Sequence, residues 1–254
     1  MRRRLFSGNL PNFDQVNQLA INMALEIKFI GTGGAFEVEL GNSSAVVAMD
    51  GSNYLVDCGH SVFPRLVKSG LVDKIDGVFV THLHDDHVGS LSSFVLYYSL
   101  VLQKGRLKIY VPTEKFQEQL VALLAHSLGD PHQRIDFRPV SEVKGAGFVD
   151  TFGRHVEWMQ TYAYYFSDGQ TSIVYSGDNG DVDFLMEEIA ALALPEPTIF
   201  HEVFFHFEIA AHAFYRHVMR WTDRYRIFGY HCDAQHAPAD NLLPLVVHHP
   251  EYLY

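Results

Sequence analysis

The segment Thr81-His82-Leu83-His84-Asp85-Asp86-His87 brings three imidazoles and two carboxylates together directly after an apolar run. Residues two apart in an extended chain face the same side, so the side chains of His82 and His84 converge on one point. A turn into a helix near Asp86 would direct Asp86 and His87 toward a second point close by. Imidazole and carboxylate suit zinc, manganese or iron, and one zinc ion takes about four ligands. The segment predicts a metal site, because without a metal so many polar groups at the end of a buried strand would cost stability.

The composition is that of an acidic globular protein. The chain has 254 residues, of which 48% are hydrophobic, and a formal charge of -11 from 30 acidic and 19 basic residues. This apolar fraction excludes a disordered chain, and the absence of a long apolar run predicts no membrane span. The acidic balance argues against a grip on long nucleic acid by bulk charge. Two cysteines are too few for a disulfide framework, so a reducing cytoplasm is the expected setting. The 15 histidines are the unusual feature of the composition.

The periodic core pattern begins only at Ala24. Before it, Arg2, Arg3 and Arg4 are followed by a polar stretch, whereas a secretory signal needs an apolar one. Residues 1–23 are therefore predicted to be an N-terminal extension, and residues 24–254 a single domain.

Hydrophobic periodicity predicts an α+β fold. Strands are expected over 25–30, 45–49, 53–57, 77–81, 107–111, 155–159, 162–166, 171–175, 198–203 and 226–230. Helices are expected over 61–68, 91–102, 113–128, 182–192 and 211–221. Strands in two batches with helices between them predict two mixed sheets packed face to face, with helices on the outside.

A glycine loop, Gly31-Thr32-Gly33-Gly34, follows the first expected strand. It does not match the dinucleotide-binding fingerprint, because Phe36 stands where the third glycine or alanine is needed and a strand follows instead of a helix. A tight turn whose backbone passes close to a site is the better interpretation.

The histidine segment, with its spacing His82-x-His84-x-Asp86-His87, resembles the signature of the metallo-β-lactamase superfamily. Three further segments extend the resemblance over 24–233: 54–59, which contains Asp57; Ser176-Gly177-Asp178-Asn179-Gly180; and His231 after the last expected strand. The resemblance implies a four-layer αββα sandwich with metals at one edge of the paired sheets. It also implies that Asp57 orients the loops of the metal site and that Asp178 bridges two ions.

The metal ligands that the resemblance implies are His82, His84, Asp86, His87, Asp178 and His231. His82, His84 and Asp178 would hold one ion, and the other four positions, again including Asp178, would hold the second. Two zinc ions are expected, with manganese as an alternative. The pattern departs from the family at Gln160-Thr161, where relatives carry another histidine. His155 is the nearest candidate but lies five residues before that place, which leaves a weakened or single-metal site as an open alternative.

Eight histidines fall from position 201 onward, too many for all of them to be metal ligands. His201-Glu202 ends an expected strand, and His212 lies at the start of an expected helix. In the ribonuclease Z branch of the superfamily, such a pair and such a histidine serve proton transfer to the leaving oxygen. The resemblance therefore implies Glu202 as the residue that orients the acid and His212 as the general acid, with core packing as the alternative. The other late histidines are expected to be surface or packing residues.

Tyr162, Tyr164 and Phe166 share one face of an expected strand, and Tyr165 takes the other. The alternation favours sandwich core, while stacking of one ring on a flat substrate group is the alternative hypothesis.

The function expected from the resemblance is hydrolysis of a phosphodiester in a small or cyclic nucleotide by a metal-bound hydroxide. Asp86 would help to take the proton of the attacking water, and His212 with Glu202 would protonate the leaving oxygen. Similar proteins of this branch include transfer-RNA-processing nucleases and cyclic-nucleotide phosphodiesterases, some of them from phages, and a homodimer is expected because such relatives often pair. Two alternatives remain: hydrolysis of an ester, thioester or lactam, and a catalytically weak binding module with an incomplete metal site.

Overall fold

The computed structural model describes residues 25–254, so the predicted extension at 1–23 lies outside the described residues. The described chain forms two mixed sheets of six and five strands. None of its helices is both long and apolar enough to cross a membrane.

The first sheet has the strand order β1-β2-β3-β4-β5-β6. Its first three strands are antiparallel neighbours, and the pairs from β3 to β6 are parallel. Asp50 and Gly51 join β2 to β3 with φ values of 50° and 77°, the left-handed turn that this dipeptide predicts. The strands are β1 (Glu26–Gly31), β2 (Ser44–Met49), β3 (Ser52–Val56), β4 (Gly77–Phe79), β5 (Leu107–Val111) and β6 (Ile135–Pro139).

The second sheet has the strand order β11-β10-β9-β8-β7. The strands β7, β8 and β9 pair antiparallel, whereas β9, β10 and β11 pair parallel. The strands are β7 (Ala146–Asp150), β8 (Tyr162–Ser167), β9 (Ser172–Tyr175), β10 (Pro197–Glu202) and β11 (Arg226–Tyr230).

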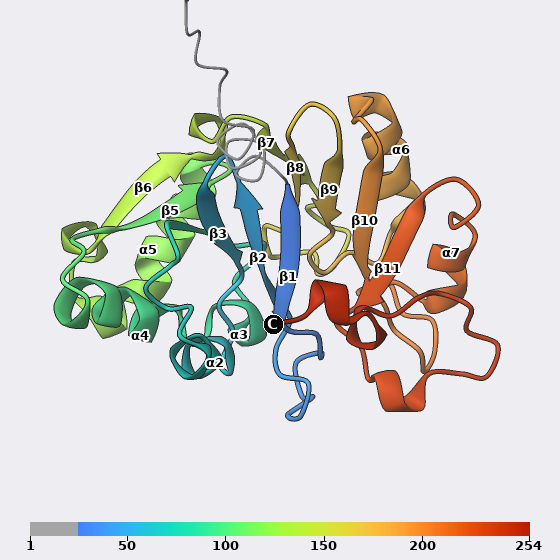
Figure 1. Cartoon of the computed structure of the whole chain (residues 1–254), viewed down its shortest axis with the longest axis horizontal. Coiled ribbons are helices and arrows are strands. Elements are labelled where there is room, and N and C mark those ends of the chain that lie inside the picture. The colour runs from blue at the N-terminus through green and yellow to red at the C-terminus, as the bar shows by residue number, and fades with distance from the viewer. Residues whose placement is uncertain (1–24) are drawn as a thin grey trace, which may run out of the picture.

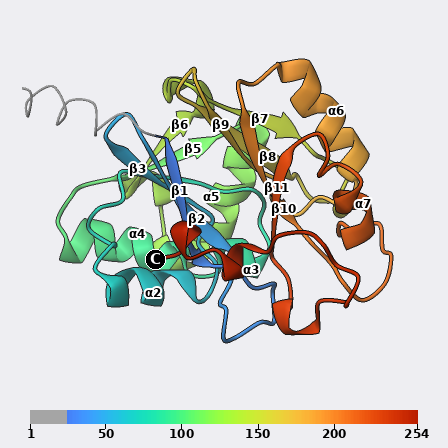
Figure 2. The same cartoon turned by 45° about the vertical axis from the view of Figure 1, so that its right-hand side comes forward.

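Helices cover the outer face of each sheet, which gives the predicted four-layer order (Figure 1). Figure 2 shows the same separation from a second direction, with α6 and α7 on one side and α2 and α4 on the other. The helices are α2 (Val62–Ser69), α3 (Asp85–Val88), α4 (Leu91–Leu96), α5 (Glu114–Leu128), α6 (Val182–Leu192) and α7 (Tyr215–Met219). A π-helical stretch, Tyr97–Val101, continues α4, and five 3₁₀ turns follow at Pro131–Gln133, Val140–Glu142, Ala234–His236, Val246–His248 and Pro250–Tyr252.

Large aromatic side chains fill the space between the two sheets. The ring of Phe79 lies 5.2 Å from that of Phe166 and 5.1 Å from that of Tyr164, measured between centroids. Tyr162, Tyr164 and Phe166 are all fully buried, which agrees with their prediction as sandwich core. Stacking of any of these three rings on a substrate, the alternative hypothesis, is excluded because none of them reaches the surface. Tyr165, on the other face of the strand, is partly buried and packs against the apolar residues behind the second sheet.

Three predictions of secondary structure need correction. Residues 155–159 form a loop instead of the expected strand. The pattern of apolar residues suggested a buried strand, but the apolar side chain of Trp158 is exposed. The helix expected over 211–221 is shorter in the structure, where only Tyr215–Met219 (α7) is α-helical. Strands β6 and β7 were missed: β6 mixes Asp136 and Arg138 into its sequence and ends on a proline, as edge strands do, and β7 contains a glycine over the ring of Tyr165.

Candidate metal centre

The histidine segment follows the end of β4, as predicted. His84 has extended dihedral angles (φ -69°, ψ 150°) and is the N-cap of α3, so the chain changes from extended to helical at Asp85. This change divides the segment. His82 and His84 precede the helix and join one group of side chains, while Asp86 and His87, in its first turn, join another.

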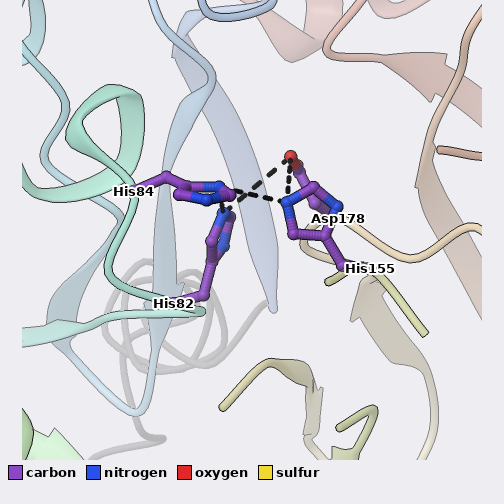
Figure 3. Close-up of side chains that lie close together, drawn as sticks. All are labelled: His82, His84, His155 and Asp178. Atoms are coloured by element: carbon purple, nitrogen blue, oxygen red, sulfur yellow. Dashed lines mark hydrogen bonds and ion pairs between the residues drawn. The ribbon is translucent and has the colours of Figure 1, made fainter. Parts of the chain in front are cut away.

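We call His82, His84, His155 and Asp178 the first cluster (Figure 3). His84 Nδ1 lies 3.0 Å from both His82 Nε2 and His155 Nε2. Asp178 Oδ2 lies 3.9 Å from His82 Nε2 and 3.8 Å from His155 Nε2. Four ligand atoms from three separate stretches of the chain therefore surround one point.

We call Asp86, His87, Asp178 and His231 the second cluster. Asp86 Oδ2 lies 3.3 Å from His87 Nε2 and 3.1 Å from His231 Nε2. Asp178 Oδ1 lies 3.4 Å from His87 Nε2 and 3.6 Å from His231 Nε2. Asp178 thus turns one oxygen to each cluster, which is the geometry of a carboxylate that bridges two ions.

The two clusters fit a pair of divalent cations. Four atoms bound about 2.0–2.1 Å from a tetrahedral zinc lie roughly 3.3 Å from one another, and the separations in both clusters bracket that value. Two buried atoms at the junction, His87 Nε2 and Asp178 Oδ1, have no hydrogen-bond partner among the described residues. A buried polar atom without a partner is costly, so a metal ion is the simplest group to satisfy both.

Protonation suits metal binding in the first cluster. Burial lowers the pKa of His82 and His84, which keeps both imidazoles neutral with a lone pair to donate. In the second cluster, burial lowers the pKa of His87 and His231 but nearby carboxylates, Asp178 foremost, outweigh burial and raise it, so a metal ion would have to displace a proton from each ring. Burial alone would raise the pKa of the Asp178 carboxyl, but His231 and His87 outweigh burial and hold it well below its usual range. Asp86 is held below its usual pKa in the same way.

Buried partners fix the orientation of the imidazoles. Asp57 is fully buried, accepts hydrogen bonds from Thr81 N at 2.7 Å and Thr81 Oγ1 at 2.9 Å, and lies 2.8 Å from His87 Nδ1. The Nδ1–H of His87 therefore points to Asp57, and Nε2 is left for the second cluster. This contact agrees with the orienting role that the resemblance implies for Asp57.

His155 completes the first cluster, although its position in the sequence did not predict it. The loop that follows β7 carries it in, and His155 Nδ1 donates to the carbonyl oxygen of Ala211 at 2.6 Å, which leaves Nε2 for the cluster. Gly180 N also donates to the carbonyl oxygen of Arg154 at 2.7 Å, so this loop is tied to the loop of Asp178. The structure therefore places a fourth candidate ligand atom in the first cluster, at the position that the sequence left one ligand short.

Glu202 and His212 lie together beside the clusters. Glu202 is fully buried; its Oε1 accepts from Asn179 N at 3.1 Å and Ala213 N at 3.0 Å, and its Oε2 lies 3.2 Å from His212 Nδ1. His212 Nδ1 is also 3.8 Å from Asp178 Oδ2. Burial lowers the pKa of His212, but the charges of Glu202 and Asp178 outweigh burial and raise this pKa to about 9. His212 lies in an extended stretch before α7 instead of at a helix start, because Glu202 holds the backbone of its neighbour Ala213.

His201, the other half of the dipeptide, does not reach the clusters. Its Nδ1 donates to the carbonyl oxygen of Glu202 at 2.8 Å, and the ring is fully buried. Only Glu202 of this pair faces the site.

A cavity of about 800 Å³ opens over the clusters. Its lining includes six histidines and several carboxylates, and none of the described residues that line it is a lysine or arginine. The lining residues are Gly34, Ala35, Phe36, Glu37, His60, Leu83, His84, Asp85, Asp86, His155, Asp178, Val203, Phe204, Phe205, His206, His212, His231, Cys232 and Asp233. Positive charge for an anionic substrate would therefore come from bound cations and protonated imidazole.

Known proteins are similar to this chain in sequence and in fold. The sequence profile of the family described as Anti-Pycsar protein Apyc1 matches residues 25–242. The chain is 30% identical over 232 residues to the Anti-Pycsar protein Apyc1 of Bacillus phage BSP38. The matched region covers 81% of this chain and 88% of that relative. It is 31% identical over 121 residues to the ribonuclease Z of Natronomonas pharaonis, covering 47% of this chain and 39% of that enzyme. The metallo-β-lactamase fold protein YhfI from Bacillus subtilis superposes with a TM-score of 0.65 at 19% identity, covering 82% and 87% of the two chains. These matches confirm the superfamily and the sandwich fold that the motifs predicted.

Proposed function

The chain belongs to the Anti-Pycsar protein Apyc1 family, and from this premise we propose that it is a metal-dependent phosphodiesterase that cleaves a small cyclic nucleotide. One observation carries the proposal: His212, paired with the buried Glu202, lies 3.8 Å from the carboxylate shared by the two clusters. That distance is measured from Nδ1, the nitrogen held by Glu202. An imidazole held in this way beside the clusters, with its other nitrogen not engaged by Glu202, suits a reaction whose leaving group is a poor one, such as a sugar alkoxide.

The residues divide the chemistry among them. Two divalent cations at such a site lower the pKa of a water molecule and neutralise charge on the phosphoryl oxygens when they are bound. Asp86 belongs to the second cluster and lines the cavity, where its carboxylate can help to take a proton from the attacking water. His212 Nδ1 is engaged with Glu202, so Nε2 is the nitrogen left to protonate the leaving oxygen.

The charges that line the cavity favour a small substrate with little negative charge. Within residues 25–254, its lining carries the carboxylates of Glu37, Asp85 and Asp233 and no lysine or arginine. A long nucleic acid would bring several phosphates past these carboxylates, whereas a cyclic mononucleotide brings a single negative charge, which the cations at the clusters would meet. The net charge of -11 also disfavours binding of a long nucleic acid.

The completed first cluster weakens one alternative. The hypothesis of a catalytically weak binding module rested on a missing ligand, and His155 stands in its place within 3.0 Å of His84. Hydrolysis of a thioester would use the same clusters and would not need the acid, because a thiolate departs more readily than a sugar alkoxide. An ester or a lactam, like a phosphodiester, needs a proton on its leaving oxygen or nitrogen.

A hydrolysis panel tests the proposal. The chain is stripped with chelator, reloaded with zinc or manganese, and assayed against 3′,5′-cyclic mononucleotides, a short RNA and a thioester, with Asp86→Ala as the blank. We expect metal-dependent cleavage of the cyclic mononucleotides, which is lost in the blank. Cleavage of the thioester alone, or no metal-dependent cleavage of any phosphodiester, would refute the proposed function.

A further inference from the structure

The wall of the cavity beyond His212 is aromatic. The ring of Phe204 lies 5.8 Å from that of His212 at an interplanar angle of 27°, and the ring of His212 lies 5.9 Å from that of His231 at 24°. Three nearly parallel rings thus lead from the second cluster to the wall. Phe204 is held firmly, because its N–H donates to Ala213 O at 2.7 Å and its carbonyl accepts from Tyr215 N at 3.1 Å.

A second phenylalanine lines the same cavity from the glycine loop. Gly34 and Glu37 close a turn through a hydrogen bond of 3.2 Å from Glu37 N to Gly34 O, and Phe36 lies within this turn. The turn abuts the second cluster: a Cβ on Gly34 would lie 3.4 Å from His231 O. The side chain of Phe36 is 97% exposed although it lines the cavity. A large apolar ring so exposed at the mouth of a cavity is available to a ligand.

The position of the proton donor decides which part of a substrate meets these rings. His212 serves the leaving oxygen in the proposed function, so the sugar that carries this oxygen, and the base attached to the sugar, lie on the His212 side of the clusters. Phe204 lines the cavity on that side. A nucleobase presents a flat π-face, which aromatic side chains bind by stacking.

We propose that Phe204 and Phe36 form a stacking subsite for the nucleobase of the substrate, an inference that rests on the proposed function. Phe204 provides the fixed ring beside the proton donor, and Phe36 provides the exposed ring at the mouth. The subsite raises affinity for substrates with an aromatic base and takes no part in the bond-breaking step.

A pair of substrates separates base binding from chemistry. The first is 3′,5′-cyclic AMP, and the second is methyl ribofuranoside 3′,5′-cyclic phosphate, which keeps the ring phosphodiester but has a methoxy group in place of the base. Both are assayed with the metal-loaded wild type, Phe36→Ala, Phe36→Trp and Phe204→Ala. Val38→Ala is the matched control, because Val38 is 85% exposed on the same loop and does not line the cavity.

We expect Phe36→Ala to raise KM for cyclic AMP by roughly 5- to 150-fold, the range measured for one base stacked on one aromatic ring, with kcat changed less than about twofold. KM for the base-free substrate should stay within about twofold, Phe36→Trp should restore binding of cyclic AMP, and Val38→Ala should behave as wild type. Phe204→Ala should likewise affect cyclic AMP more than the base-free substrate.

Two results would overturn the inference in different ways. Equal KM values of the wild type for the two substrates, or equal losses on both in Phe36→Ala, would remove the base subsite and leave the phosphodiesterase standing. Failure of the wild type to cleave either substrate would refute the proposed function itself, and the subsite with it.

Discussion

Replacing Glu202 with glutamine removes the charge that holds the proton on His212 and leaves the shape of the site unchanged. Glutamine retains an oxygen that can accept from Asn179 N and Ala213 N, as Glu202 Oε1 does at 3.1 and 3.0 Å. The variant should therefore fold. The pKa of His212, raised to about 9 beside Glu202, should fall to the value of a free imidazole, about 6.5, or below it, because burial lowers the pKa once the carboxylate is gone.

The size of the effect follows from these two values. A general acid must be protonated, so the rate falls as the pH rises through its pKa. At pH 8 about nine tenths of His212 is protonated with a pKa of about 9, but roughly 3% with a pKa of 6.5, so kcat should fall about 30-fold. Bound cations lower both pKa values, and the comparison therefore rests on the displacement of the alkaline limb between wild type and variant.

The assay is a pH–rate profile for a cyclic mononucleotide and for a p-nitrophenyl phosphodiester, whose leaving group needs no proton. We expect the alkaline limb for the cyclic nucleotide to move to lower pH in Glu202→Gln, with little change for the activated substrate. Glu208→Gln is the matched control, because Glu208 is an exposed carboxylate between β10 and α7, the segment that also carries His212. An unmoved limb, or an equal loss on both substrates, would refute the role of Glu202 and His212 in proton transfer.

Three further variants test the metal centre. His155→Ala should reduce bound metal from two ions to one per chain by elemental analysis, while His206→Ala, an exposed histidine at the cavity, should keep two; unchanged stoichiometry in the first would remove His155 as a ligand. Asp57→Asn should weaken the second ion about 10- to 100-fold in a competitive chelator titration, because the Nδ1–H of His87 loses its carboxylate partner, and an affinity within twofold of wild type would contradict this role. Gly177→Ala should lower the free energy of unfolding by about 1–3 kcal/mol, because the φ of Gly177 is +60° and a Cβ would lie 2.8 Å from a backbone carbonyl oxygen of β8. Urea denaturation of the chelated protein measures this change, and an unchanged urea midpoint would contradict the steric argument.

The sequence predicts those parts of the site that depend on local spacing. His82, His84, Asp86 and His87 lie on one strand-to-helix turn, so periodicity alone divides them between two points. Asp178 and His231 follow predicted strands at the same edge of the sandwich; the Ser-Gly-Asp motif indicates Asp178, and the place after the last expected strand indicates His231. The layers of the fold were equally predictable, because buried strands such as β4 and β9 carry continuous apolar runs.

His155 could not be predicted in the same way. Its place in the first cluster depends on its own hydrogen bond to Ala211 O, 56 residues away, and on the bond from Gly180 N to the carbonyl oxygen of the preceding Arg154, 26 residues away. Neither backbone partner has a side-chain signature. The helix expected over 211–221 fails for a related reason, since the buried carboxylate of Glu202 holds Ala213 in an extended stretch. In both places a long-range contact to the backbone overrides local propensity.

The most direct test of the two-cluster metal centre is anomalous diffraction from crystals of the zinc-loaded chain. The geometry predicts two zinc peaks about 3.5–4 Å apart, as in other two-metal sites, with Asp178 between them. One peak should lie among His82, His84 and His155, and the other among Asp86, His87 and His231. A single peak, or a first peak that the imidazole of His155 does not touch, would contradict the account.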